Sequence, residues 1–306
     1  MTRETPPAHR DNDRSLTSQA RITEHLQALA LYPLPQHAIS RLVHAVTRCQ
    51  RRWVKRPLIR WFIRRFRVPM HEAAEPDPDG YRHFNAFFTR ALAPGSRPLP
   101  GAANAVTAPA DGAVSALGTL QGDALIQAKG RYYALTQLLG GAPEDAAPLR
   151  GGHFATIYLS PADYHRVHMP IAGDLRAMTH IPGRLFSVGR ATVRTVPKLF
   201  TRNERVACLF DTAVGPMALV LVGAINVGSI ETVWAGEVTP PRGRQIRRTT
   251  YAPGSIRLDR GEEMGRFNMG STAIVVLPPG TTAWDTALEA DTPVRVNQAL
   301  GRLTGD

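Results

Sequence analysis

Residues 217–235 read MALVLVGAINVGSIETVWA, an apolar stretch that is interrupted by glycines and by Asn226. It cannot cross a bilayer, because a spanning helix takes about 20 uninterrupted apolar residues. HFATIYLS at residues 153–160 and TAIVVLP at residues 272–278 share its β-branched and apolar character, and Gly and Pro bound them. These three stretches predict buried strands, so we expect the body of the protein to be mainly β within an α+β class.

The region before the strands has a helical pattern instead. Apolar residues recur at helical spacing between residues 22 and 46, and again in RRWVKRPLIRWFIRRFRVP at residues 51–69. The next segment, HEAAEPDPDG at residues 71–80, is acidic and rich in proline, which is typical of a linker. We therefore predict a disordered tail at 1–20, a helical region at 21–70 and a catalytic body at 71–306. The apolar stripe of the second helical segment consists of Leu58, Ile59, Phe62, Ile63 and Phe66.

Composition and charge narrow the class of protein. Apolar residues make up 43% of the 306 residues and charged residues 20%, which indicates a globular chain. The formal net charge is +12, and residues 1–70 alone carry 14 basic and 4 acidic side chains. The basic character therefore belongs to the N-terminal arm, which favours contact with a polyanion. Cys49 and Cys208 stand far apart, so neither a disulfide framework nor a cysteine-built zinc site is expected, and a reducing compartment is the simplest interpretation.

The basic arm has the composition of a helix that lies on a membrane surface. Arginines and tryptophans accompany its apolar stripe, and such helices place arginines on lipid phosphates. We expect Leu58, Phe62 and Phe66 to enter the lipid. An alternative is a charged helix that packs on the body through the same stripe. Nucleic acid is not expected as a partner, because no nucleic-acid motif accompanies the basic residues.

Three short segments carry residue types that nucleophilic catalysis needs. They are APADGAV at 108–114, SPADYHRVHMP at 160–170 and FNMGSTAIVV at 267–276. A serine needs a base, and the base needs a carboxylate that fixes its tautomer, so the three segments together could supply such a set. Each is weak evidence alone. Asp-Gly is most often a turn, and the two histidines have no third ligand nearby that would make a metal site.

The serine of the third segment does not lie in the elbow of ordinary hydrolases. GxSxG is absent around Ser271, because the sequence reads Asn-Met-Gly-Ser-Thr-Ala. A different chemistry fits the Gly270-Ser271 pair. If Ser271 attacks the carbonyl of Gly270, which has no side chain to obstruct the approach, the peptide bond rearranges to an ester. Elimination of the ester and hydrolysis would leave a pyruvoyl group, which is an internal electrophile.

An ordered series of segments resembles the bacterial phosphatidylserine decarboxylase proenzymes of the membrane-associated type. The resemblance covers roughly residues 70–280, with the basic arm before it. One departure is visible, since Met269 stands where the family commonly has Leu in its Leu-Gly-Ser-Thr cleavage motif. Met conserves volume and polarity, so we expect processing to survive. The segments are PADG, YHRVHMP, IPGRLFSV, LFTRNERV, GPMALVLVGAINVGSIETVWAG and GEEMGRFNMGSTAIVV.

The resemblance implies a role for individual residues. Cleavage would fall between Gly270 and Ser271, and Ser271 would become the pyruvoyl group that forms a Schiff base with the substrate. His168 matches the general base of the family and Asp111 its charge-relay aspartate, whereas His165 matches a residue that acts in decarboxylation. Asp163 could orient either imidazole, but a helix cap or a surface carboxylate explains it equally well.

The resemblance also implies an activity, a location and partners. The protein would convert phosphatidylserine to phosphatidylethanolamine and CO2 at the cytoplasmic face of the bacterial inner membrane, as a peripheral protein. Its precursor would yield a β chain of residues 1–270 and an α chain of residues 271–306, and the resemblance leaves room for a homodimer. No metal and no PLP are expected, and the chain has only three lysines. The fold implied is a compact, barrel-like arrangement of sheets.

Two other functions remain open from the residues alone. One is a membrane-associated Ser-His-Asp lipid hydrolase that uses Ser271 without cleaving itself. It would remain a single chain and react with a fluorophosphonate probe. The other is a non-catalytic lipid-binding protein whose function is the basic arm, and which would not depend on Ser271.

Overall fold

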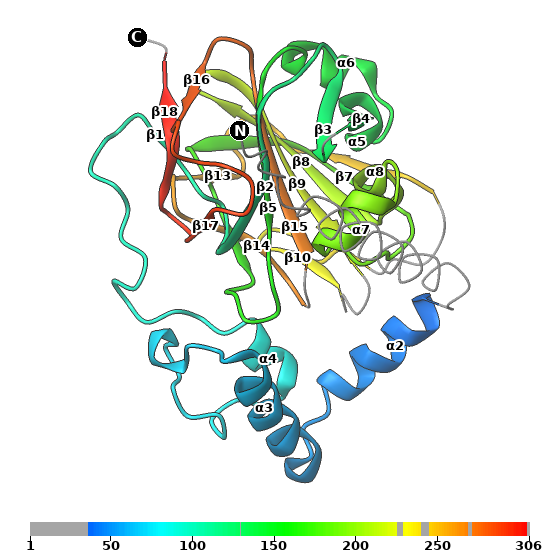
Figure 1. Ribbon diagram of the computed structural model, residues 1–306, viewed down its shortest axis with the longest axis vertical. Coiled ribbons are helices and arrows are strands. Elements are labelled where there is room, and N and C mark those ends of the chain that lie inside the picture. Colours follow the sequence, from blue (N-terminus) through cyan, green and yellow to red (C-terminus); the bar gives the residue numbers. More distant parts are fainter. Residues whose placement is uncertain (1–35, 129, 225–228, 240–244, 269–270, 305–306) are drawn as a thin grey trace, which may run out of the picture.

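The computed structural model describes residues 36–128, 130–224, 229–239, 245–268 and 271–304 (Figure 1). The expected tail at 1–20 and the first part of the helical region, residues 21–35, lie outside them. Strands dominate the described chain, so the prediction of a mainly β body is confirmed. The barrel-like description fits only loosely, because the described sheets are open: the end strands of the largest sheet do not pair with each other.

The centre of the fold is a nine-stranded sheet that contains all three of the predicted buried strands. They become β5, β9 and β15, which lie side by side in antiparallel pairs. Their β-branched and apolar residues suit this place, because both faces of the central strands are covered. The strand order is β12 (Arg247–Thr250), β7 (Gly173–Ile181), β8 (Arg205–Thr212), β9 (Gly215–Gly223), β15 (Ser271–Leu277), β5 (His153–Tyr158), β2 (Gly112–Thr119) and β17 (Pro293–Val294), and β13 (Arg257–Leu258) pairs with β7.

Three smaller sheets surround the large one. The first has four strands and contributes one wall of the candidate site. Its order is β11 (Gly236–Glu237), β10 (Ile230–Thr232), β14 (Glu263–Phe267) and β6 (Arg166–His168). The other two are β1 (Ala105–Thr107), β18 (Ala299–Leu303) and β16 (Thr282–Trp284), and the hairpin of β3 (Ala124–Ala128) with β4 (Arg131–Ala134).

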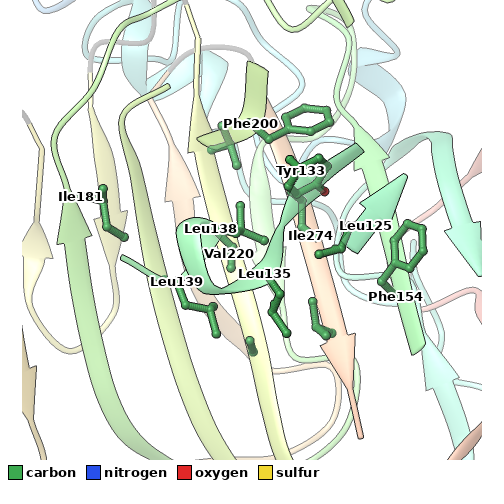
Figure 2. Close-up of a cluster of buried hydrophobic side chains, with 14 of the residues drawn as sticks. Leu125, Tyr133, Leu135, Leu138, Leu139, Phe154, Ile181, Phe200, Val220 and Ile274 are labelled. Atoms are coloured by element: carbon green, nitrogen blue, oxygen red, sulfur yellow. The ribbon is translucent and has the colours of Figure 1, made fainter. Parts of the chain in front are cut away.

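Short helices and the β3–β4 hairpin cover one face of the large sheet. Figure 2 shows the cluster of buried side chains beneath them, in which Leu135 and Leu138 of α5 lie over Val220 and Ile274 of the sheet. The sequence pattern did not predict these helices, because three of the four have a single turn and none develops a helical period. They are α5 (Leu135–Leu138), α6 (Pro143–Ala146), α7 (Arg190–Thr195) and α8 (Leu199–Arg202), with the 3-10 turn η2 (Ala147–Leu149).

The other face of the large sheet packs against the four-stranded sheet. The second core cluster lies between them, with Leu219, Leu221 and Val275 from the large sheet and Met264 and Phe267 from the small one. All five side chains are at most 1% exposed. This dry layer fixes the distance between the two sheets, and the strands that carry the candidate catalytic residues belong to one sheet or the other.

The helical region lies at one end of the sheets (Figure 1). It contains α2 (Gln36–Thr47), α3 (Arg52–Phe66) and the 3-10 turn η1 (Met70–Glu72), and α4 (Phe84–Phe88) follows. The predicted apolar stripe exists, but it does not face lipid. Ile59 is fully buried and Phe62 is 5% exposed, and both pack against α4. Among the described residues, no helix is long and apolar enough to cross a membrane.

The segment predicted as a linker folds onto the body instead. Glu72 accepts hydrogen bonds from Arg97 at 2.7 Å and Arg295 at 2.8 Å. Ala73 forms a bridge with Leu92, and Asp79 forms ion pairs with arginines of α3. The acidic residues that suggested a solvated linker are thus partners of arginines. Their ion pairs connect this segment to α3 on one side and to the body on the other.

Candidate active site

Ser271 is the first residue of β15 and is completely buried. Its backbone pairs with Gly223 of β9, and its carbonyl accepts the N–H of Leu159 at 3.0 Å. The Oγ atom has no hydrogen-bond partner among the described residues. Leaving a buried hydroxyl unpaired costs free energy, so such an atom is a candidate for reaction. Met269 and Gly270, and with them the carbonyl of the predicted cleavage site, lie outside the described residues.

The position of Ser271 directs its side chain toward the four-stranded sheet. Side chains alternate between the two faces of a strand, so Ser271 shares a face with Val275. Val275 belongs to the core cluster that faces β6 and β14. The strand β14 of the small sheet ends at Phe267 and β15 of the large sheet begins at Ser271, so the predicted cleavage site falls in the sequence between these two strands.

The two histidines of the second segment lie at the two ends of β6, the edge strand of the small sheet, and their side chains face opposite ways. His165 lies directly before β6, and its carbonyl accepts the N–H of Phe267 at 2.9 Å. His168 ends β6, opposite Glu263 of β14. A separation of three residues puts their side chains on opposite faces of an extended strand. The burial agrees, since His165 is completely buried and His168 is only partly buried.

His165 is a neutral imidazole in an apolar setting. Its ring packs against Phe88 at a centroid distance of 4.0 Å, and Nδ1 donates to the carbonyl of Asp163 at 2.8 Å. That hydrogen bond leaves the lone pair on Nε2, which is buried and has no partner in the part of the chain that the structure describes. Burial, aided by the charge of Arg90, lowers the pKa of His165 to about 3. His165 therefore offers an unoccupied proton acceptor inside the protein.

His168 uses both ring nitrogens. Nδ1 lies 2.7 Å from the carbonyl of Gly261 and donates to it, and Nε2 accepts the hydroxyl of Tyr164 at 2.9 Å. Burial lowers the pKa of His168 below the usual 6.5, although the hydrogen bond to Gly261 and the charge of Glu263 oppose the shift. The imidazole is therefore neutral near neutral pH, as a general base must be, and the Tyr164 hydroxyl occupies its basic lone pair.

Asp111 lies on the loop between β1 and β2, and it is held by other groups than the histidines. Arg97 donates to both of its oxygens, at 3.1 and 2.6 Å, and the N–H of Val296 donates to Oδ1 at 2.7 Å. The loop itself reaches the base through the backbone, since the N–H of His168 donates to the carbonyl of Pro109 at 2.7 Å. The negative charge of Asp111 raises the pKa of His168, but less than burial lowers it.

The structure thus brings the predicted residues to two facing sheets and their connecting loops, without a hydrogen-bonded Ser-His-Asp chain among the described atoms. The side chain of Asp163 orients neither imidazole, because its Oδ2 accepts the N–H of Ser160 at 2.6 Å; its backbone carbonyl orients His165. Sequence reasoning missed Tyr164 and Arg97. Tyr164 stood inside the YHRVHMP segment that carried the histidines, so that segment was the available signal.

No cluster of His, Cys, Asp and Glu side chains suited to a metal ion occurs within the described ranges. Cys208 is buried in β8, and burial raises the pKa of its thiol. Cys49 is a second free thiol. The candidate nucleophile among the described residues of the site is Ser271.

Comparison with known proteins gives a consistent assignment. The family model described as phosphatidylserine decarboxylase matches residues 84–302, and a second model, described as PSD, matches residues 26–67. The chain is 61% identical over 254 residues to the phosphatidylserine decarboxylase proenzyme of Alkalilimnicola ehrlichii, with 83% of this chain and 88% of that protein covered. It is 54% identical over 281 residues to the phosphatidylserine decarboxylase proenzyme of Ectopseudomonas mendocina, with 91% of this chain and 98% of that protein covered. It is 56% identical over 272 residues to that of Pseudomonas aeruginosa, with 88% of this chain and 94% of that protein covered. Both the catalytic body and the basic arm are matched, and the chain belongs to the phosphatidylserine decarboxylase family.

Proposed function

We propose that this chain is a precursor that cleaves its own Gly270–Ser271 bond and then decarboxylates phosphatidylserine to phosphatidylethanolamine. The products of cleavage are residues 1–270 and residues 271–306, with a pyruvoyl group derived from Ser271. The observation that carries the proposal is the buried Ser271 hydroxyl, which has no partner and begins a core strand. The family relationship supports the same assignment.

The residues around Ser271 fit a pyruvoyl group. The conversion removes a hydroxyl and an amine and leaves a small ketone at the start of β15. Because Gly223 lies opposite Ser271, no side chain from that position of β9 competes for that face. The hydroxyl also forms no hydrogen bond that would be lost in the conversion.

The self-cleavage step is an acyl shift followed by an elimination. A base takes the proton of Ser271 Oγ, the oxygen bonds to the carbonyl carbon of Gly270, and the C–N bond breaks to give an ester and a free amine at Ser271. Removal of the α proton of residue 271 then expels the Gly270 carboxylate. The resulting dehydroalanine takes up water and releases ammonia. The overall balance is one water consumed and one ammonia released.

We assign the base of this step to His168. Its neutral state at neutral pH supports the assignment, as does the link of its backbone to the Asp111 loop. The proposal requires the Tyr164 hydroxyl to release Nε2 or to pass the serine proton to it. Asp111 contributes a negative charge that favours the imidazolium once it forms, and Arg97 and Val296 hold that carboxylate in place.

We assign His165 to the decarboxylation step. When present, the pyruvoyl ketone supplies an electron sink for the electrons that CO2 leaves behind. The uncharged ring of His165 and the face of Phe88 form an apolar surface, which favours loss of charge from a carboxylate. The vacant Nε2 of His165 can accept a proton at this place and return it to the product.

The decisive test of the proposed function is an intact-mass spectrum of the purified protein. We expect two chains that end and begin at the Gly270–Ser271 bond, and the shorter chain should lack a free amino group. Their masses should sum to that of the precursor plus water minus ammonia. One chain of full length that reacts with a fluorophosphonate probe would establish the hydrolase alternative. One full-length chain without such reactivity would favour a non-catalytic lipid-binding protein.

We also propose that the outer surface of α3 holds the protein on an anionic membrane. Trp53 is 79% exposed and Trp61 is 55% exposed, which is unusual for tryptophan and typical of membrane interfaces. Arg64 and Arg65 beside Trp61 form no ion pair with any described residue, whereas Arg56 is paired with an aspartate. A surface hollow at this place is lined by Arg56, Pro57, Arg60, Trp61, Arg64 and Arg65, which suits phosphate groups of lipids.

Replacement of Arg64 and Arg65 by Gln should weaken binding to vesicles that contain phosphatidylglycerol by about 30-fold at low salt. Each arginine contributes about 1 kcal/mol near such a surface, and salt screens the contribution. Trp61→Ser should remove a part of the binding that salt does not screen. Vesicle co-sedimentation measures both effects.

Arg150→Gln with Arg302→Gln is a matched control, because both arginines are exposed on the catalytic body and Arg302 lies on β18, at the other end of the molecule (Figure 1). This control should bind vesicles as the parent does. Equal binding by the parent and the Arg64/Arg65 variant would refute the assignment of the membrane contact to α3. A Phe62 variant is unsuitable for this test, since Phe62 belongs to the packed interface with α4.

A further inference from the structure

Three buried polar side chains from distant parts of the chain meet just before the proposed cleavage site. They are Asn85 of α4, Ser229 before β10 and Asn268 after β14. Their exposed fractions are 7%, 1% and 2%, respectively. Polar groups with so little exposure are costly unless they pair, so their arrangement requires an explanation.

The three side chains satisfy one another. Asn85 Nδ2 donates to Asn268 Oδ1 at 2.9 Å, and Asn268 Nδ2 donates to the Oγ of Ser229. The backbone joins the same network, because the N–H of Asn268 donates to the carbonyl of Ser229 at 2.8 Å. Asn268 is thus held by its backbone and by both ends of its amide, two residues before Gly270.

The remaining neighbours of the Gly270–Ser271 bond are held by backbone hydrogen bonds of the two sheets. Phe267 pairs with His165, and Ser271 pairs with Gly223 and Leu159. Asn85 differs from these partners, since it belongs to neither sheet and acts through its side chain. Together with Ser229, it is one of the two side chains that hold the amide of Asn268.

Helix α4 is itself rigidly placed. Phe84, Phe87 and Phe88 are at most 2% exposed, and Phe62 of α3 contacts all three rings at centroid distances of 5.1 to 6.0 Å. His83 caps the helix by accepting the N–H of Ala86 at 3.0 Å. Asn85 therefore projects from a well-packed support, as a positioning group must.

We propose that Asn85 is a positioning residue for self-cleavage: through its hydrogen bond to Asn268 it holds the segment before Gly270 in the place where Ser271 can attack. The inference rests on the proposed function. Its physical basis is the steep dependence of intramolecular attack on alignment, because a displacement of about 1 Å far from the reacting atoms can cost about 100-fold in rate. Asn85 does not touch the reacting bond, and its effect is exerted on cleavage and not on decarboxylation.

The test follows the rate of maturation of a full-length precursor made by cell-free synthesis, with the two bands separated on a gel. Asn85→Leu keeps the side-chain volume and removes the donor. We expect it to cleave about tenfold more slowly than the parent, which is the effect of about one buried hydrogen bond. Asn85→Asp should recover part of the rate, since the Asn268 amide can turn and donate to the carboxylate.

Two further measurements separate positioning from general damage. Asn268→Leu should slow cleavage, and the double variant Asn85→Leu/Asn268→Leu should be no slower than the slower single variant, because both changes break the same link. Turnover of phosphatidylserine per mole of pyruvoyl group should equal that of the parent in Asn85→Leu. Thr89→Val is the matched control, because it removes a buried hydrogen bond of 2.9 Å from the residue that caps α4 to the backbone carbonyl of Asn85, and it leaves the side-chain bond between Asn85 and Asn268 in place.

Each outcome decides between the alternatives. The inference would be refuted if Asn85→Leu cleaved at the parental rate, or if the effects of the two Leu substitutions added in the double variant. It would also be refuted if Asn85→Asp cleaved as slowly as Asn85→Leu, or if Thr89→Val slowed cleavage as much as Asn85→Leu does. A loss of decarboxylation per pyruvoyl group would assign Asn85 a role in the mature enzyme instead and overturn the proposal. If the parent itself never cleaves, the proposed function fails, and that result is distinct from all the others.

Discussion

Ser271→Ala should remain a single chain of 306 residues and have no decarboxylase activity. Alanine has no oxygen to attack the Gly270 carbonyl, so neither the ester nor the pyruvoyl group can form. The change itself is small, because the Ser271 hydroxyl is buried without a hydrogen-bond partner and its removal leaves no other group unpaired. Folding should therefore survive, and the loss of activity should be complete.

The measurement is an intact-mass spectrum together with release of CO2 from phosphatidylserine. Thr272→Val provides the matched control, since Thr272 is the next residue, is equally buried, and also has a hydroxyl without a partner. It faces the opposite side of β15 and should cleave as the parent does. Two chains in Ser271→Ala, or a cleavage defect in Thr272→Val as large as that in Ser271→Ala, would refute the role of Ser271.

The main strands could be predicted from the sequence because both of their faces are buried, and burial on both faces requires a continuous run of apolar residues. The residues of β5, β9 and β15 are apolar on both faces, and a continuous β-branched run predicts such a strand. The short helices over the first core cluster could not be predicted in this way. A helix of four residues, such as α5, covers the sheet with Leu135 and Leu138 but has too few turns to form a period.

The orientation of α3 shows another limit of sequence reasoning. Its stripe predicted an apolar surface correctly, but a stripe does not specify whether lipid or protein covers it. The aromatic residues Phe84 and Phe88 of α4 cover it here, and they come from a separate segment of the chain. In α3, Trp53 and Trp61 are exposed, and they lie outside the stripe.

The candidate site was predictable in its residue types but not in its connections. Asp111, His165, His168 and Ser271 were proposed from their segments, because nucleophilic chemistry uses few residue types. The pairing of Asp111 with Arg97 and of His168 with Tyr164 depends on how loops meet, and spacing in the sequence does not report such contacts. The same is true of Asn85, which meets Asn268 across 183 residues.

The second large effect is expected at the two histidines, which should separate the two reactions. His168→Ala should remain uncleaved, because the serine hydroxyl is a poor nucleophile without a base. His165→Ala should cleave into two chains but decarboxylate at a rate lower by at least about 100-fold, the usual contribution of a positioned acid or base. Band conversion on a gel measures the first reaction, and CO2 release per pyruvoyl group measures the second.

The pH dependence of self-cleavage supplies an independent check on the base. The reaction needs the neutral imidazole, and burial lowers the pKa of His168 below 6.5. The cleavage rate should therefore stay constant as the pH falls through 6.5 and decline only when it reaches the lower pKa of the folded protein. His165→Ala should keep this profile. A decline centred at or above the ordinary pKa of histidine would argue against His168 as the base.

Because the side chains of His165 and His168 face opposite ways, either outcome of these two substitutions identifies the base of the cleavage step. His165 lies opposite Phe267, which ends β14 before the cleavage site in the sequence, and its Nε2 is vacant. His168 is farther along β6, opposite Glu263, and its Nε2 is occupied by Tyr164. If His165→Ala stays uncleaved while His168→Ala matures, the vacant inward-facing imidazole is the base. If His168→Ala alone stays uncleaved, the Tyr164 hydroxyl must either move away from Nε2 of His168 or pass the serine proton to it. Tyr164→Phe should then alter the rate of cleavage. It should not block the turnover of phosphatidylserine by enzyme that has already matured.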